Sequence, residues 1–150
     1  ATPVAAGPGR ILHETWGQVA LYDVPGGAQR WVTREAAAQR NPAVVHAGHI
    51  YMFGGQSGEY LTCLDAATGA VKWTSRIYRG HLVLAGETLV VLSESAGQLR
   101  LVAADPSGYR ELARVAVLAP GARTGTPPSI GAGHIFVRNL EEIVAVKVGG

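Results

Sequence analysis

The chain is built from short apolar runs separated by glycine turns and polar corners, which is the pattern of strands joined by hairpin-length loops. Strong runs occupy residues 50–53, 89–92 and 135–137. Many runs are apolar on successive residues rather than alternating, which indicates that both faces of each small sheet are covered. The pattern therefore predicts an all-β fold of blades stacked around an axis. A two-sheet sandwich ranks second, because it would expose one face of each sheet and give cleaner alternation.

One corner recurs along the chain. In residues 64–73 an apolar run meets Asp65, a turn closes at Gly69, and a second run reaches Trp73. Aspartate accepts hydrogen bonds from the backbone two residues on, and glycine permits the positive φ of a tight corner. A second copy with the same spacing uses Asp23, Gly27 and Trp31.

A third copy of the corner is degraded. It begins at Asp105, places Gly108 one position earlier than the other two copies, and has Ala113 where tryptophan would fall. The three aspartates are 42 and then 40 residues apart. A period of this length is typical of propeller blades.

Aligning the chain on these corners divides it into three four-stranded blades and a three-stranded fourth. The sequence predicts one partial β-propeller domain over residues 1–150, with blades at about 2–33, 41–75, 80–116 and 127–148. The missing strand leads us to expect the C-terminal half of a larger propeller, or one half of an oligomeric one. Residues 33–40 contain good helix formers, and we interpret them as the connection between two blades in preference to a functional helix.

Composition excludes several classes of function. The net charge is only +2 and no basic block occurs, so no nucleic-acid surface is expected. No apolar run approaches the roughly twenty residues of a membrane-spanning helix. The single cysteine, Cys63, excludes an internal disulfide and is predicted to be a buried thiol rather than a nucleophile. No nucleophile elbow or phosphate-binding loop is visible.

The histidines show no metal-ligand spacing, so no metal site is expected. His49 and His134 follow Gly48 and Gly133 at equivalent places in two blades. This equivalence favours a role in the turn or at the start of the strand.

The corner of residues 64–73 resembles the repeat of the pyrroloquinoline-quinone (PQQ)-like propellers, and the resemblance covers about the whole chain. It implies that Trp31 and Trp73 dock adjacent blades and that Asp23 and Asp65 fix the corners. The segment after residue 133 is similar to the last blade of such proteins. These motifs are fairly specific for the fold and nearly silent on function.

The family includes quinone-dependent dehydrogenases, in which glutamate and asparagine hold a calcium ion beneath the quinone. In this chain Asn139, Glu141 and Glu142 offer suitable oxygens, but an exposed acidic turn is the preferred interpretation. No cofactor is expected, with PQQ and calcium as the alternative.

Partner binding is the better functional class, because loops on one face of a propeller vary freely over a rigid ring. The connections between second and third strands and those between blades should share that face. Trp16 is the large aromatic residue of these loops, and packing against its own hairpin is an equal alternative. The candidate partner-binding residues are Trp16, Gln56, Glu59, Arg79, Glu94, Arg123 and Arg138.

The sequence thus favours a non-catalytic scaffold for protein contacts. By family resemblance, its setting is the bacterial periplasm or the extracellular space. The expected partner is another protein, further blades of the same propeller, or a second copy of the chain. The alternative is the C-terminal part of a PQQ-dependent and calcium-dependent dehydrogenase whose cofactor ligands lie mostly outside these residues.

Overall fold

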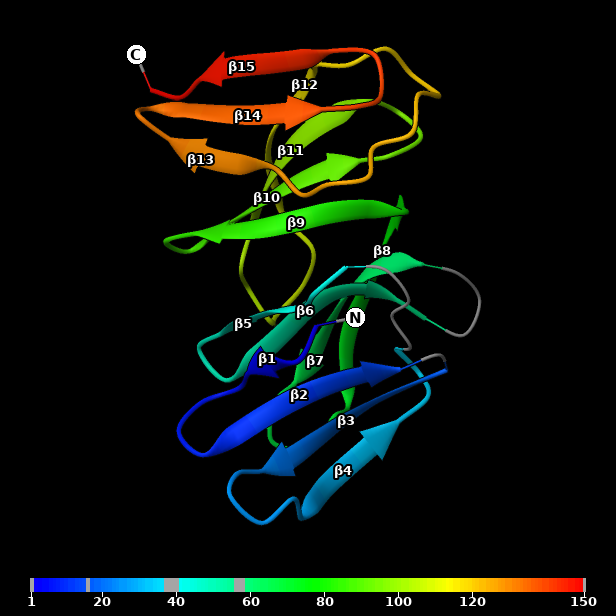
Figure 1. Cartoon of the computed structure of the whole chain (residues 1–150), viewed down its shortest axis with the longest axis vertical. Coiled ribbons are helices and arrows are strands. Elements are labelled where there is room, and N and C mark those ends of the chain that lie inside the picture. The colour runs from blue at the N-terminus through cyan, green and yellow to red at the C-terminus, as the bar shows by residue number, and fades with distance from the viewer. Residues whose placement is uncertain (1, 16, 37–40, 56–58, 150) are drawn as a thin grey trace. The chain divides into compact units, whose positions relative to one another are not determined.

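The computed structural model describes residues 2–15, 17–36, 41–55 and 59–149, which form four antiparallel sheets (Figure 1). The first sheet contains β1 (Val4–Ala5), β2 (Arg10–Thr15), β3 (Gln18–Asp23) and β4 (Gln29–Thr33). The second contains β5 (Val44–His46), β6 (His49–Gly54), β7 (Tyr60–Asp65) and β8 (Val71–Tyr78). The third contains β9 (Gly80–Ala85), β10 (Thr88–Ser93), β11 (Gln98–Ala103) and β12 (Glu111–Ala116). The fourth contains β13 (Ser129–Gly131), β14 (His134–Arg138) and β15 (Ile143–Lys147).

Within each sheet the strands follow one another in chain order, so every connection joins neighbours. The predicted all-β fold of three four-stranded units and one three-stranded unit is confirmed. The first and third sheets also share an irregularity, a register shift after Leu21 and after Leu101. Leu21 pairs with Trp31 on β4, and Leu101 pairs with Ala113 on β12. The register therefore places Ala113 where the first sheet has its tryptophan.

One strand end differs from the prediction, and the preferred interpretation of residues 34–36 as a connection agrees with the structure. Strand β8 runs to Tyr78, beyond the predicted end of the second blade at about residue 75, and the next sheet begins directly after Arg79. Residues 34–36 form a bend and a turn rather than a helix, and residues 37–40 lie outside the described part of the chain. Among the residues that the structure describes, no helix is long and apolar enough to cross a membrane.

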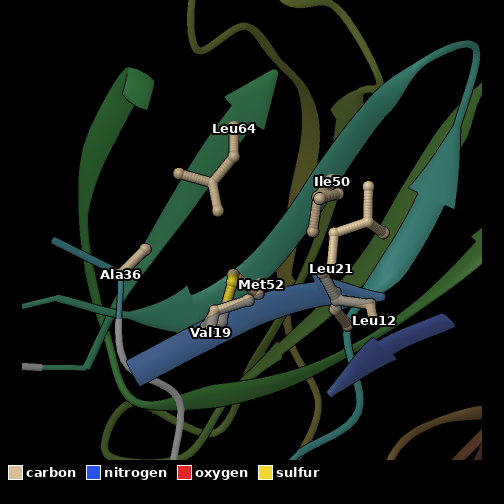
Figure 2. Close-up of a cluster of buried hydrophobic side chains, with 8 residues drawn as sticks. Leu12, Val19, Leu21, Ala36, Ile50, Met52 and Leu64 are labelled. Carbon is tan, nitrogen blue, oxygen red and sulfur yellow. The ribbon is translucent and has the colours of Figure 1, made fainter. Parts of the chain in front are cut away.

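The chain divides into two compact units. Unit 1 comprises Ala1–Arg76 and the corner Asp105–Tyr109, and unit 2 comprises Ile77–Ala104 and Arg110–Gly150. In the core of unit 1, Figure 2 shows Leu21 of the first sheet near Ile50 of the second and Val19 near Met52, all in one buried cluster. Burial of these apolar side chains is the main favourable contribution to the stability of the unit.

The core of unit 2 forms in the same way between the third and fourth sheets. Val90 and Leu92 of β10 and Leu99 of β11 pack with Ile135 and Val137 of β14. Strands β6 and β10 are buried on successive residues, which is the two-sided burial that their unbroken apolar runs predict. Strand β12 is largely exposed along its length.

Candidate partner-binding surface

The Asp65 corner is held by its own side chain. Asp65 Oδ1 accepts hydrogen bonds from the backbone N–H groups of Ala67 at 2.8 Å and Thr68 at 2.9 Å. The N–H of Gly69 closes the turn on the Asp65 carbonyl at 2.8 Å. Desolvation acts to raise the pKa of Asp65, but the bonds from Thr68 and Ala67 stabilise the carboxylate and leave its pKa below the usual value.

The other two corners vary this arrangement. At the first corner the N–H of Gly27 again donates to the Asp23 carbonyl at 2.9 Å, and the Asp23 carboxylate pairs with Arg30 Nε at 2.7 Å. At the third corner Asp105 Oδ1 accepts from the N–H of Ser107 at 2.8 Å. Asp65 and Asp105 thus cap their own corners through the side chain, whereas the Asp23 carboxylate binds Arg30 instead, because the residue two positions on is Pro25, which has no N–H.

The two tryptophans bind main-chain carbonyls of a later corner. Trp31 Nε1 donates to the Ala66 carbonyl at 3.0 Å, and Trp73 Nε1 donates to the Asp105 carbonyl at 2.8 Å, both within unit 1. The Trp73 ring also packs against Tyr51 and Tyr109, with centroids 6.1 Å and 6.0 Å apart. Each indole therefore fills an apolar gap and satisfies its polar atom at once.

In unit 2, three connecting segments contact one another and form what we call the loop surface: the β10–β11 turn (94–97), the connection 117–128 and the β14–β15 turn (139–142). The N–H groups of Val117 and Leu118 both donate to the Gly97 carbonyl at 3.0 Å. The N–H of Ala119 donates to Glu142 Oε1 at 2.8 Å. These bonds join the connection between two sheets to a turn of each, as expected from the order of the strands.

Four of the predicted partner-binding residues lie on or beside the loop surface. Arg123 and Arg138 are exposed. Arg79 and Glu94 are half-buried, and the N–H of Glu94 donates to the Arg79 carbonyl at 3.0 Å. The Arg79 guanidinium lies 5.2 Å from the centroid of the Tyr78 ring. Arg123 and Arg138 are therefore better placed than Arg79 and Glu94 to reach a partner.

The other three predicted residues do not join this group. Glu59 belongs to unit 1 and is half-buried. Trp16 and Gln56 lie outside the described residues, so the interface role of Trp16 stays a prediction.

Sequence reasoning missed one prominent surface residue. Leu140, at the β14–β15 turn, is 78% exposed, the highest exposure among the large hydrophobic residues that the structure describes. Its signal in the sequence is an apolar residue within an otherwise polar turn, between Asn139 and Glu141. Exposed Arg138 lies two positions earlier, at the end of β14, so an aliphatic and a cationic residue are both exposed near this turn in the sequence.

The same turn does not fit a calcium site as it stands. Asn139 Oδ1 accepts from the N–H groups of both Glu141 and Glu142 at 2.8 Å, and Glu142 Oε1 binds the Ala119 N–H. These oxygens already accept hydrogen bonds from main-chain N–H groups. Across the described part of the chain, no group of three or more His, Cys, Asp and Glu side chains converges as metal ligands would.

The remaining candidate groups have structural positions. His49 Nδ1 lies 2.9 Å from the Ala47 carbonyl, and His134 Nδ1 lies 2.8 Å from the Ala132 carbonyl, so both histidines bind their own turns. Cys63 is fully buried, and burial raises the pKa of its thiol to about 11. A thiol that holds its proton so firmly is a poor nucleophile.

The sequence of the chain also matches a known protein family. The profile of the family described as outer membrane protein assembly factor BamB matches residues 15–106. The chain belongs to this family. No curated protein matches the chain in sequence.

Solved structures agree with the family on the fold. BamB from Moraxella catarrhalis superimposes with a TM-score of 0.76 at 16% identity, over 93% of this chain and 43% of that one. The quinohemoprotein alcohol dehydrogenase from Comamonas testosteroni superimposes with a TM-score of 0.68 at 14% identity, over 91% of this chain and 28% of that one. The computationally designed Ika4 protein superimposes with a TM-score of 0.67 at 9% identity, over 95% of this chain and 88% of that one. The chain thus spans less than half of the BamB structure, and these likenesses concern the fold.

Proposed function

We propose that this chain is a non-catalytic propeller scaffold that binds another protein through the loop surface of unit 2. The observation that carries the proposal is the β14–β15 turn, which holds Leu140 78% exposed beside exposed Arg138. An aliphatic side chain kept in water costs free energy that a partner can recover. Arginine beside it is a frequent interface residue, because it covers apolar area while keeping its charge hydrated.

Rigidity supports the same proposal. Asn139 Oδ1 binds two consecutive N–H groups of the turn, and Glu142 ties the turn to Ala119 in the connection. A surface whose backbone is already fixed loses little conformational entropy when a partner binds. The loop surface is therefore organised for association before a partner arrives.

Family membership supports the setting. The family description names outer membrane protein assembly, so we propose a bacterial envelope location and a partner among the proteins that assemble outer membrane proteins. Further blades of the same propeller, or a second copy of the chain, are the other partners proposed.

Reversing charge on the loop surface tests the partner role. The double variant Arg123→Glu/Arg138→Glu is expected to weaken binding to purified outer-membrane assembly proteins by about tenfold, because each change adds repulsion at an exposed rim position. Thermal unfolding should be unchanged, since both side chains are exposed. Arg110→Glu, an exposed change at the β11–β12 corner, is the control and should bind normally. Equal binding by the double variant and the control would remove the loop surface as the interface.

The proposed scaffold needs neither PQQ nor calcium. We expect that addition of both produces no bound chromophore and no dye-linked alcohol oxidation, measured by absorbance after gel filtration and by dye reduction. The physical reason is that Asn139 and Glu142 already cap main-chain N–H groups. A stoichiometric chromophore that requires calcium would instead favour the dehydrogenase alternative.

A further inference from the structure

The slot between the third and fourth sheets lacks the indole that fills equivalent positions in unit 1. Trp31 pairs with Leu21 across β3 and β4, and Ala113 occupies the same register opposite Leu101. Leu21 is buried under its tryptophan, whereas Leu101 is only half-buried. The methyl group of Ala113 covers much less apolar surface than an indole does.

A cavity lies in this slot, entirely within unit 2. Its larger part has a volume of about 410 Å³ and is lined by residues that include Val90, Ile130 and His134. An adjoining part of about 240 Å³ is lined by residues that include Ala113, Val115 and Val146. The two parts share Leu101, Ile135 and Val148, so they adjoin, and we call them together the groove, whose lining is mainly aliphatic. Val115 is 48% exposed, which shows that the groove opens to solvent along β12.

One residue that lines the groove is the register equivalent of the residue whose carbonyl an indole binds in unit 1. Trp31 donates to the carbonyl of Ala66, whose own N–H binds the Gly48 carbonyl at 2.9 Å. In the fourth sheet, Val148 makes the corresponding bond to the Gly133 carbonyl, also at 2.9 Å. Val148 is therefore the register equivalent of Ala66, and it lines both parts of the groove.

Charge at the groove narrows the chemistry of the occupant. Arg114 and Lys147 line the smaller part of the groove. The carboxylate of Glu111 is shared between Arg114, at 2.7 Å, and Arg100, at 2.8 Å, so one negative charge faces two positive ones. Arg114 and Lys147 thus place two cationic residues at this end of the groove. Acidic residues beside an inserted aromatic side chain would meet a complementary field.

We propose that this groove binds a tryptophan side chain presented by an acidic segment of a partner polypeptide. The indole fills the aliphatic slot between Leu101 and Ile135, and its N–H is directed at the main chain of Val148. Carboxylates on the same segment lie toward Arg114 and Lys147. The inference rests on the proposed scaffold role only in taking the occupant to be a polypeptide, and it concerns a surface separate from Arg123 and Arg138.

The test uses the intact protein and a blocked peptide with one tryptophan between two aspartates. In methyl NMR spectra the peptide is expected to shift the resonances of Leu101, Ile135 and Val148. The same peptide with alanine in place of tryptophan should leave them unshifted. Arg123→Glu/Arg138→Glu should bind the peptide normally, which separates this result from a failure of the loop surface.

Two groove variants complete the test. Ala113→Trp should supply the missing indole, raise the unfolding temperature and weaken peptide binding at least tenfold. Val115→Asp should weaken peptide binding similarly, because it places a carboxylate in the groove. This variant provides the test if Ala113→Trp does not fold. Leu112→Trp and Leu112→Asp, at the adjacent exposed position of β12 that does not line the groove, are the matched controls and should bind normally.

Several outcomes would overturn the proposal. These are equal shifts with the alanine peptide, unchanged binding by both groove variants, or absence of any shift with the tryptophan peptide. Concentration-dependent broadening of the groove methyl resonances without peptide would identify a second copy as the occupant and would also overturn it.

Discussion

Replacing Gly69 by alanine is expected to lower the free energy of unfolding by about 2–4 kcal/mol, from backbone strain and overpacking together. Gly69 has φ +75°, a conformation in which a Cβ is strained. A Cβ built there would lie 2.6 Å from Cε3 and 2.8 Å from Cδ2 of Trp31. The indole cannot move away freely, because its Nε1 is bonded to the Ala66 carbonyl. Urea denaturation measures the loss.

Gly27 provides a matched control for this prediction. It occupies the same position of the first corner with φ +69°, and a Cβ there would meet nothing within 4 Å. Gly27→Ala should therefore lower the free energy of unfolding through backbone strain alone, by about 1 kcal/mol. In a Trp31→Leu background the cost of Gly69→Ala should fall toward the same value, because the ring that collides is gone. Equal losses for the two glycines in the native background would show that Trp31 does not dock on Gly69.

The stability of the protein is expected to fall as pH rises from about 4.5 to about 7, by up to about 3 kcal/mol, because of Glu14. Glu14 lies on β2 and is only 2% exposed. Its Oε1 accepts from the N–H of Ala43 at 3.1 Å, and its Oε2 is buried without a hydrogen-bond partner among the described residues. Desolvation by burial raises the pKa of Glu14 to about 7, although the bond from Ala43 acts to lower it.

The sign follows from which state releases its proton first. Below pH 4.5, the ordinary value for glutamate, the side chain is protonated in both the folded and the unfolded chain. Between that value and about 7 only the unfolded chain ionises, so each pH unit favours unfolding by about 1.4 kcal/mol. Above about 7 both states are ionised and this contribution stays constant.

Glu14→Gln should abolish this slope while keeping an oxygen for the Ala43 N–H. Glu87→Gln, at an exposed position, is the control and should retain it. Urea midpoints measured from pH 4 to pH 8 give the comparison. A glutamine variant with the wild-type pH profile would show that Glu14 is not the group responsible.

The blades were predictable because their signals are local. Glycine with positive φ and an aspartate that accepts hydrogen bonds from its own turn depend on neighbours in sequence, so Asp65 and Gly69 mark a corner before any tertiary contact is known. The number of strands could be predicted in the same way, because turn residues separate one apolar run from the next. The extension of β8 to Tyr78 was not predictable, because no turn residue marks its end before Arg79.

The candidate site was predictable only in part, because exposure and burial depend on distant segments. Glu14 reads as the polar end of a strand, and its burial arises from packing beside Ala43, far along the chain. The arginines of the loop surface could be chosen from their loops, whereas the exposure of Leu140 depends on how the turn is capped. Ala113 was visible as a missing tryptophan, but the groove beside it requires the fourth sheet.

The docking of the tryptophans also bears on how such a repeat evolves. Trp31 binds a carbonyl of alanine and Trp73 a carbonyl of aspartate, because the acceptor is main chain in both cases. Substitution of the accepting residue therefore leaves the bond in place, and sequence can change at that position without loss of the contact. A lineage built on such contacts conserves geometry more strictly than residue identity. The superposition on BamB at 16% identity is what such drift would leave behind.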